Sequence, residues 1–299
     1  MDIKAKTVLL DVANRTGRLK PIDGENASRL KRVLSEMLAD IQEKCEACNI
    51  IPFVVYGTAL GAYRHCGFIP WDDDVDIAMI RQDWELFKTK FDELFQGKYI
   101  LEAPQYKNKD SIGVWGKIFL PNTSFIELIN LNTPYEKGIF IDVFIIDGLS
   151  NNKIVRKIDL FIARAMRFIA NSKGYYSYSN DFLNEIMSSS IKSRLYLYFR
   201  KAIGFSFSWV SHKTWCTWYD KFVSRHKDTE WTIINYDDGI TRRDEWFPVK
   251  KIKFETIEVN VPNDIVGYLT KTFGSNYMEL PPIEKREQHF CVELDFGEH

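Results

Sequence analysis

Four aspartates occupy the five positions from 72 to 76, inside the otherwise apolar stretch VYGTALGAYRHCGFIPWDDDVDIAM (residues 55–79). Two carboxylates about 4 Å apart near a protein surface repel each other by several kcal/mol, so such a cluster needs protons or a nearby cation to offset the repulsion. A run of aspartates is also common in solvated turns and helix caps. The surrounding sequence decides between these interpretations.

Alternation predicts a β-strand over 74–80, in which Asp74 and Asp76 face one side and the apolar residues between them face the core. Their Cα atoms would then lie roughly 6.7 Å apart, so both carboxylates can reach one cation or two neighbouring ones. Asp142 stands alone in the apolar segment IFIDVF (139–144), where an unpaired charge is costly. We predict that these three aspartates hold Mg²⁺ or Mn²⁺ rather than zinc, because no pair of His or Cys lies nearby.

A phosphate-binding turn is predicted just before the acidic cluster. The apolar strand 51–56 runs into Gly57 and Thr58 and then into a short helix, and the free N–H groups of such a turn can bind phosphate. Arg64 on that helix and Lys117 in a later strand are second-rank phosphate partners. Divalent metal, phosphate and basic side chains together are typical of phosphoryl transfer.

The stretch YGTALGAYRHCGFIPWDDDVDIAM resembles the signature of the LicD family, which is related to the fukutin proteins and shares the nucleotidyltransferase fold. GIFIDVFIIDG (138–148) resembles the family's second aspartate motif, and the segment from EWFPVKK to MELPP (245–282) resembles its C-terminal pattern. The resemblance extends from about residue 27 to His289 and is weakest over 150–227.

This resemblance implies an α+β fold with a mixed β-sheet flanked by helices. It places the superfamily's turn, a glycine followed by a hydroxyl residue, on Gly57 and Thr58, with Thr where many members have Ser. Its three acids, which are the implied catalytic and metal-binding residues, fall on Asp74, Asp76 and Asp142. Asp142, or a neighbouring carboxylate, could also orient or deprotonate the acceptor hydroxyl.

The implied activity is that of a metal-dependent phosphotransferase of the phosphocholine transferase type. The enzyme would move phosphocholine from CDP-choline to a sugar hydroxyl of a surface glycan, such as lipopolysaccharide, teichoic acid or capsule. Three alternatives stay open. They are transfer of phosphoethanolamine, glycerol phosphate or ribitol phosphate from its CDP form, genuine nucleotidyl transfer, and non-catalytic binding of a glycan or nucleotide.

A choline cargo would need aromatic faces around its quaternary ammonium, each contributing about 0.5–2 kcal/mol. The candidates are Trp71, Trp115, Tyr135, Phe140 and Trp246. Because 14% of the chain is aromatic, each of these rings can equally belong to the core. His289, near the C-terminal pattern, is a further candidate, with a surface or packing role as the alternative.

Charge and cysteine usage bear on partners and location. The 40 basic and 41 acidic residues give no sign of nucleic acid binding, yet 14 basic and four acidic residues lie in 153–227, about +10 against −11 elsewhere. Aromatic and basic residues mix over 190–227, which favours contact with an anionic membrane surface or a solvated face over an aromatic core. The five cysteines are scattered, and we interpret Cys45 and Cys48 as core thiols. The sequence also shows no signal peptide and no membrane-spanning segment. Together these observations favour a cytoplasmic enzyme at the inner face of the cell membrane.

We predict three parts in the 299-residue chain. A nucleotidyltransferase-like core covers 1–149, a basic, aromatic helical lobe covers 150–230, and a C-terminal segment over 231–299 completes the core. Helical periodicity is expected over 25–48, 81–95 and 264–273. Strands are expected over 51–56, 74–80, 99–103, 113–120, 124–130, 139–146, 231–236 and 251–260.

Overall fold

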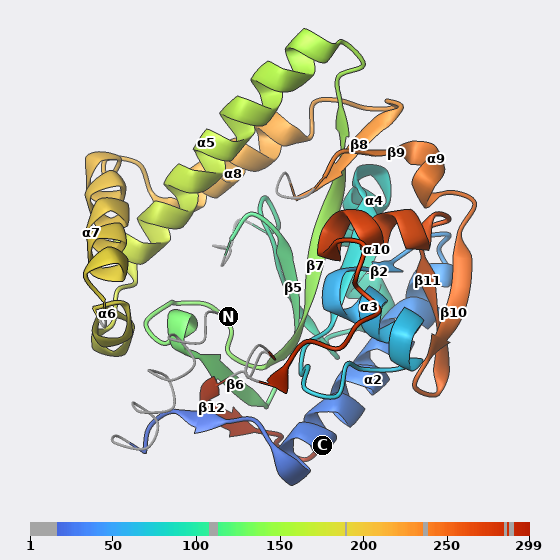
Figure 1. The fold of residues 1–299 in the computed structure, drawn as a ribbon, viewed down its shortest axis with the longest axis horizontal. Helices are drawn as coiled ribbons and strands as arrows, with labels where there is room; N and C mark the ends of the chain where they lie inside the picture. The colour runs from blue at the N-terminus through green and yellow to red at the C-terminus, as the bar shows by residue number, and fades with distance from the viewer. Residues whose placement is uncertain (1–16, 108–112, 189, 236–238, 284–285, 287–289) are drawn as a thin grey trace.

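The computed structural model describes residues 17–107, 113–188, 190–235, 239–283, 286 and 290–299 (Figure 1). Its described strands form one nine-stranded mixed sheet and one three-stranded sheet. The large sheet has the order β10-β11-β2-β3-β7-β5-β4, with β8 paired to β7 and β9, and the small one has the order β1-β12-β6. Their bounds are β1 (Lys20–Pro21), β2 (Phe53–Val54), β3 (Asp76–Ile80), β4 (Ile100–Glu102), β5 (Gly116–Leu120), β6 (Ser124–Glu127), β7 (Ile139–Leu149), β8 (Trp231–Ile234), β9 (Thr241–Arg242), β10 (Lys250–Phe254), β11 (Ile257–Val261) and β12 (Phe290–Asp295).

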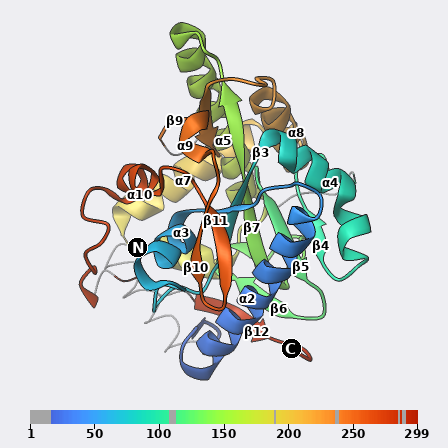
Figure 2. The same cartoon turned by 90° about the vertical axis from the view of Figure 1, so that its right-hand side faces the viewer.

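Helices cover both faces of the large sheet, as Figure 2 shows: α2 and α4 lie on one face, and α3 and α10 lie on the other. The α+β class, with a mixed sheet flanked by helices, is therefore confirmed. The helices around the sheet are α2 (Gly24–Glu46), α3 (Tyr56–His65), α4 (Arg81–Phe95), α9 (Arg243–Trp246) and α10 (Ile265–Phe273). A short 3₁₀ helix follows β6 at Leu128–Asn130.

The apolar stripe predicted over 25–48 forms the inner face of α2. All of its apolar members are buried, namely Leu30, Val33, Leu34, Met37, Leu38, Ile41 and Cys45. Burial raises the pKa of the Cys45 thiol, as is typical of a core cysteine, while Cys48 is half-buried and also a free thiol. The helix predicted over 81–95 coincides with α4.

The middle of the chain is helical, as predicted. Figure 1 shows these helices to one side of the large sheet, and their bounds are α5 (Lys153–Ser177), α6 (Asp181–Met187), α7 (Ile191–Ser206) and α8 (His212–Val223). We call these four helices the helical lobe. A second apolar cluster joins the lobe to the sheet, because Trp215 and Tyr219 of α8 pack with Leu149 of β7 and Ile233 of β8. The division of the chain at residues 150 and 230 stays a prediction.

The strands near the C-terminus differ from the prediction in two ways. The strand expected over 251–260 is a hairpin, in which β10 and β11 pair antiparallel and Glu255 in the turn takes a φ of +51°. No strand is predicted over 290–295, yet β12 pairs with both β1 and β6. Those partners are far away in the sequence, so local periodicity gives no indication of this pairing. Within the described residues, no helix is both long and apolar enough to cross a membrane.

A buried ion group joins α4, β7 and α8. Arg81 Nε lies 2.7 Å from Asp147 Oδ1, and Arg81 Nη1 lies 2.8 Å from Asp220 Oδ1. The three residues are 7%, 2% and 1% exposed. Burial alone would lower the pKa of Arg81, but the charges of the two carboxylates outweigh it and raise that pKa. The group ties the helical lobe to the sheet.

Candidate active site

Two aspartates lie next to each other at the centre of the large sheet. β3 and β7 run parallel, and Asp76 pairs in register with Asp142, so their backbones are about 4.8 Å apart. The N–H of Asp142 donates to the carbonyl of Val75 at 3.1 Å. Ile77 and Val143, the residues that follow the two aspartates, are buried, so the carboxylates lie on the opposite face of the sheet.

Asp74 lies two residues before β3, so the strand predicted over 74–80 is two residues too long. Its side chain nevertheless lines the same cavity as Asp72 and Asp76, as the predicted alternation requires. Burial, and then the charges of four neighbouring aspartates, raise the pKa of Asp74 well above its usual range. A bound cation would relieve this accumulation of negative charge.

The cavity at Asp74 and Asp76, called the donor cavity below, has a volume of about 600 Å³. Its walls are the first turns of α3, the acidic loop before β3, and a C-terminal segment after α10. It brings together the predicted residues Gly57, Arg64, Trp71, Asp74 and Asp76.

Gly57 and Thr58 lie in the first turn of α3 instead of in a loop. A Cβ at Gly57 would lie 2.7 Å from Asp72 Oδ2, so only glycine lets this carboxylate approach the helix. Thr58 is buried, and its hydroxyl accepts a hydrogen bond from the Asp76 N–H at 2.9 Å. Thr58 thus holds α3 against β3, and the N–H groups of this first turn have no carbonyl partner within the helix. Phosphate contact by Gly57 and Thr58 stays a prediction.

Arg64 forms part of the cavity wall. Its Nη1 donates to the carbonyls of Tyr277 at 2.7 Å and Glu279 at 3.2 Å, and its Nε donates to His65 Nε2 at 3.0 Å. Arg64 therefore fastens the segment after α10 over the donor cavity. Its predicted phosphate contact stays a prediction.

Asp142 has a cation and an indole as partners. Lys117 Nζ lies 3.0 Å from its Oδ1 and 3.1 Å from its Oδ2, and Trp115 Nε1 donates to Oδ1 at 2.8 Å. Lys117 is buried, lies 3.2 Å from the centroid of the Phe140 ring, and is 4.0 Å from Glu127 Oε2. The sequence predicts Lys117 and Asp142 as site residues but not their pairing across β5 and β7.

Of the three predicted metal ligands, Asp74 and Asp76 share the donor cavity, whereas Asp142 pairs with Lys117. These two carboxylates lie in a region of excess negative charge, whereas Lys117 neutralises Asp142. Among the residues described, no three Asp, Glu, His or Cys side chains are arranged to hold a metal ion. Asp74 and Asp76 are the residues that would hold a metal here, and metal binding by these two residues and by Asp142 stays a prediction.

A second cavity, of about 470 Å³, opens beside Asp142 between the sheet and the helical lobe. We call it the acceptor cavity. The sequence prediction names four of its lining residues, Trp115, Lys117, Tyr135 and Asp142. It misses those that the lobe contributes, Asn171, Gly174, Tyr175, Tyr178, Leu183, Tyr196, Arg200 and His212. The one sequence signal for them is a charged residue, Arg200, on the inner face of α7 between Leu197 and Gly204.

The five aromatic candidates fall into two groups. Trp71 lines the donor cavity, and Trp115 and Tyr135 line the acceptor cavity. Phe140 is buried beneath Lys117. Trp246 is 1% exposed and lines neither cavity, and its Nε1 donates to Thr241 Oγ1 at 3.1 Å. His289 lies outside the described residues.

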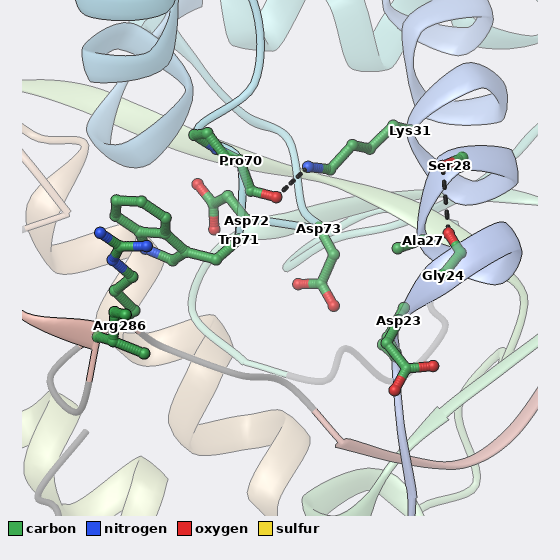
Figure 3. A pocket seen from close by; sticks show the side chains of 12 residues that line it. Asp23, Gly24, Ala27, Ser28, Lys31, Pro70, Trp71, Asp72, Asp73 and Arg286 are labelled. Carbon is green, nitrogen blue, oxygen red and sulfur yellow. Dashed lines mark hydrogen bonds between the residues drawn. The ribbon is translucent and has the colours of Figure 1, made fainter.

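A third cavity, of about 470 Å³, adjoins the acidic loop and shares Trp71 and Asp72 with the donor cavity (Figure 3). The guanidinium of Arg286 lies over the Trp71 ring, 4.3 Å from its centroid. Lys31 donates to the carbonyl of Pro70 at 2.9 Å. Burial lowers the pKa of Lys31, although the charges of Asp72 and Asp73 oppose this. Basic side chains from two distant segments thus hold the acidic loop in place.

Comparison with known proteins places this site in a family. Residues 49–169 match the family model described as LicD/FKTN/FKRP, nucleotidyltransferase domain. These residues form a LicD-family domain. It contains β2, α3, β3 and β7, and hence Asp74, Asp76 and Asp142.

Similarity to one LicD protein extends beyond this domain. The chain is 25% identical over 252 residues to the lipopolysaccharide cholinephosphotransferase LicD of Haemophilus influenzae. The matched residues cover 83% of this chain and 90% of that protein. Shorter matches include an uncharacterized protein of Caenorhabditis elegans, 40% identical over 57 residues, which cover 19% of this chain and 15% of that protein. An uncharacterized protein of Rickettsia prowazekii is 42% identical over 55 residues, or 18% of this chain and 21% of that protein.

Proposed function

We propose that this chain is a transferase that moves phosphocholine from CDP-choline to a sugar hydroxyl of a cell-surface glycan. The observation that carries this proposal is the in-register pair Asp76 and Asp142, of which Asp76, together with Asp74, lines the donor cavity and Asp142 lines the acceptor cavity. The likeness to a lipopolysaccharide cholinephosphotransferase supports the same substrate class.

The donor would bind on the α3 side of the carboxylates. Asp74 and Asp76 would hold Mg²⁺, which when bound neutralises the charge that develops on the departing nucleotide. The donor cavity, at about 600 Å³, lies in the size range of sites for small molecules and cofactors. The N–H groups of Gly57 and Thr58 in the first turn of α3 would contact the donor phosphates, whereas the Tyr56 N–H donates to Tyr268 Oη at 3.0 Å. Arg64 keeps the C-terminal wall closed over the donor cavity.

The acceptor hydroxyl would approach Asp142 from the other cavity. Its oxygen forms a bond to the phosphorus of the phosphocholine group, the phosphoanhydride bond to CMP breaks, and the hydroxyl proton passes to Asp142. Lys117 and Trp115 hold this carboxylate in one orientation through contacts at both of its oxygens. Trp71 lines the donor cavity and would contact the choline headgroup there, whereas Trp115 and Tyr135 line the acceptor cavity.

Donor specificity tests the proposal. The purified protein is incubated with Mg²⁺, a glycan acceptor preparation and, in turn, CDP-choline, CDP-ethanolamine, CDP-glycerol or CDP-ribitol, and CMP release and product mass are measured. We expect CMP release and a phosphocholine-bearing product with CDP-choline, both abolished by EDTA. Release of pyrophosphate would instead indicate nucleotidyl transfer. Nucleotide binding without turnover of any donor would contradict the transferase assignment.

We also propose that α7 rests on an anionic membrane surface, which would suit an enzyme with a lipid-linked acceptor. Six apolar side chains with helical spacing are each more than half exposed, although an apolar stripe normally faces a core. They are Ile191, Leu195, Tyr198, Phe199, Phe205 and, just after the helix, Trp209. Exposed Lys192 and Arg194 flank this stripe, so its charge complements anionic headgroups.

Liposome sedimentation at low salt tests this contact. The protein is expected to sediment with vesicles that contain phosphatidylglycerol and to stay in solution with pure phosphatidylcholine. The double variant Leu195→Ser/Phe199→Ser should lose most of this binding, whereas Leu86→Ser/Val266→Ser, which alters exposed apolar residues elsewhere, should keep it. Absence of vesicle binding, together with a concentration-dependent dimer that the first variant abolishes, would assign the stripe to a second copy of the chain.

A further inference from the structure

Arg200 is a buried cation that has no ionic partner among the described residues. It is 6% exposed on the inner face of α7 and lines the acceptor cavity. In the described part of the chain, no Asp or Glu oxygen lies within 4.0 Å of its guanidinium. Its Nη1 donates only a long hydrogen bond, 3.4 Å, to Tyr196 Oη, and its Nε has no hydrogen-bond partner among the described residues.

Aromatic rings compensate part of this buried charge. The guanidinium carbon lies 4.3 Å from the ring centroid of Phe168, 5.0 Å from that of Tyr175 and 5.8 Å from that of Tyr196. Such contacts stabilise a cation but leave its N–H donors unused, and a buried donor without an acceptor destabilises the fold. The other charged residues that line the cavity pair with one another: Lys117 contacts both Asp142 and Glu127. The unused donors of Arg200 therefore mark a place for an anion.

We propose that Arg200 binds an acidic group on the acceptor, a carboxylate or a phosphate, while the sugar that carries this group occupies the acceptor cavity with one hydroxyl at Asp142. This inference rests on the proposed function and names the acceptor class as an anionic sugar. The planar fork of an arginine matches both acidic groups, because two of its N–H groups can donate to two oxygens at once.

The rest of the cavity suits a sugar ring. Tyr175, Tyr178 and Tyr196 line it with aromatic rings, and Asn130, Thr133 and Asn171 are further polar residues around the same space. Tyr135 Oη and His212 Nδ1 lie 2.9 Å apart, which fixes the orientation of both side chains. Arg200 and Asp142 come from different parts of the chain, the lobe and the sheet, so one ligand can contact both only by occupying the space between them.

Ligand binding measured without any donor tests the proposal separately from the transferase activity. The full-length protein is titrated by calorimetry with methyl glucuronide, glucose 6-phosphate and neutral methyl glucoside. We expect at least one anionic sugar to bind about tenfold or more tightly than the neutral one, since hydrogen bonds to a charged group are strong when buried. The glucuronide and the phosphate separate a carboxylate from a phosphate as the recognised group.

Variants of α7 locate the effect. Arg200→Met should abolish the preference for the anionic sugar, and Arg200→Lys, which keeps the charge but loses the fork, should retain part of it. Lys201→Met is the matched control, because the Lys201 side chain contacts Asn184 and does not line the cavity. Circular dichroism checks whether each variant is folded. If Arg200→Met does not fold, Arg200→Lys still decides the test.

Two results would overturn the inference: equal affinity of the wild-type protein for charged and neutral sugars, or an unchanged anion preference in folded Arg200 variants. Absence of transfer from every CDP-alcohol, with anion binding intact, would count against the proposed function alone.

Discussion

Replacing Asp76 with Asn is expected to slow phosphocholine transfer on the order of 10³-fold, a loss of about 4 kcal/mol of transition-state stabilisation. The substitution keeps the shape of the side chain and the backbone N–H that bonds Thr58, but it removes one of the two charges that would hold the metal. Initial rates of CMP release at several Mg²⁺ concentrations measure the effect.

The control for this prediction is Asp228→Asn, which alters a carboxylate that is 77% exposed and lines neither the donor nor the acceptor cavity. It should leave the rate unchanged.

Asp142→Asn separates the two roles open to that residue: a lower rate at unchanged Mg²⁺ dependence indicates contact with the acceptor hydroxyl, and a higher Mg²⁺ requirement indicates metal binding. Near-normal turnover of folded Asp76→Asn would remove the carboxylate pair from the mechanism.

Replacing Arg81 with Met is expected to lower the free energy of unfolding by about 3–5 kcal/mol, because it leaves Asp147 and Asp220 buried without their cation. Burial already raises the pKa of Asp147 in spite of Arg81, so this carboxylate is poorly solvated even in the intact group. Urea unfolding monitored by circular dichroism gives the difference between variant and wild type.

A surface ion pair supplies the comparison for Arg81. Lys98 lies 2.7 Å from Asp40 Oδ2 but is 57% exposed, so Lys98→Met should change stability by less than about 1 kcal/mol. The triple variant Arg81→Met/Asp147→Asn/Asp220→Asn should recover part of the loss, because neutral amides tolerate burial better than unpaired carboxylates. Equal effects of Arg81→Met and Lys98→Met would show that the buried group contributes little.

Features of this fold that depend on local pattern could be predicted from the sequence. The helical period over 81–95 defines α4 without error, and the isolated charge at Asp142 identifies the strand that pairs with β3. Asp74 and Asp76 flank the buried Val75, and this alternation of polar and apolar residues is likewise a local property of the chain.

Features that join distant segments could not be predicted in this way. Lys117 and Asp142 meet only because β5 and β7 pair antiparallel at that register. The acceptor cavity forms only where the helical lobe faces the sheet, so Arg200 has no local signal beyond its place between buried apolar neighbours. β12 depends on two partners that lie at least 160 residues earlier in the chain, and β10 and β11 are separated by one tight turn within a continuous β-like pattern.

Among the described residues, the donor and acceptor cavities share no lining residue, and their aspartates Asp76 and Asp142 lie on neighbouring strands of one sheet. Under the proposed assignment, nucleotide and sugar occupy separate cavities, so neither has to depart before the other arrives. Such an arrangement favours a ternary complex and direct displacement at phosphorus, in which the stereochemistry of the transferred group inverts once, over a ping-pong route through a phosphorylated enzyme.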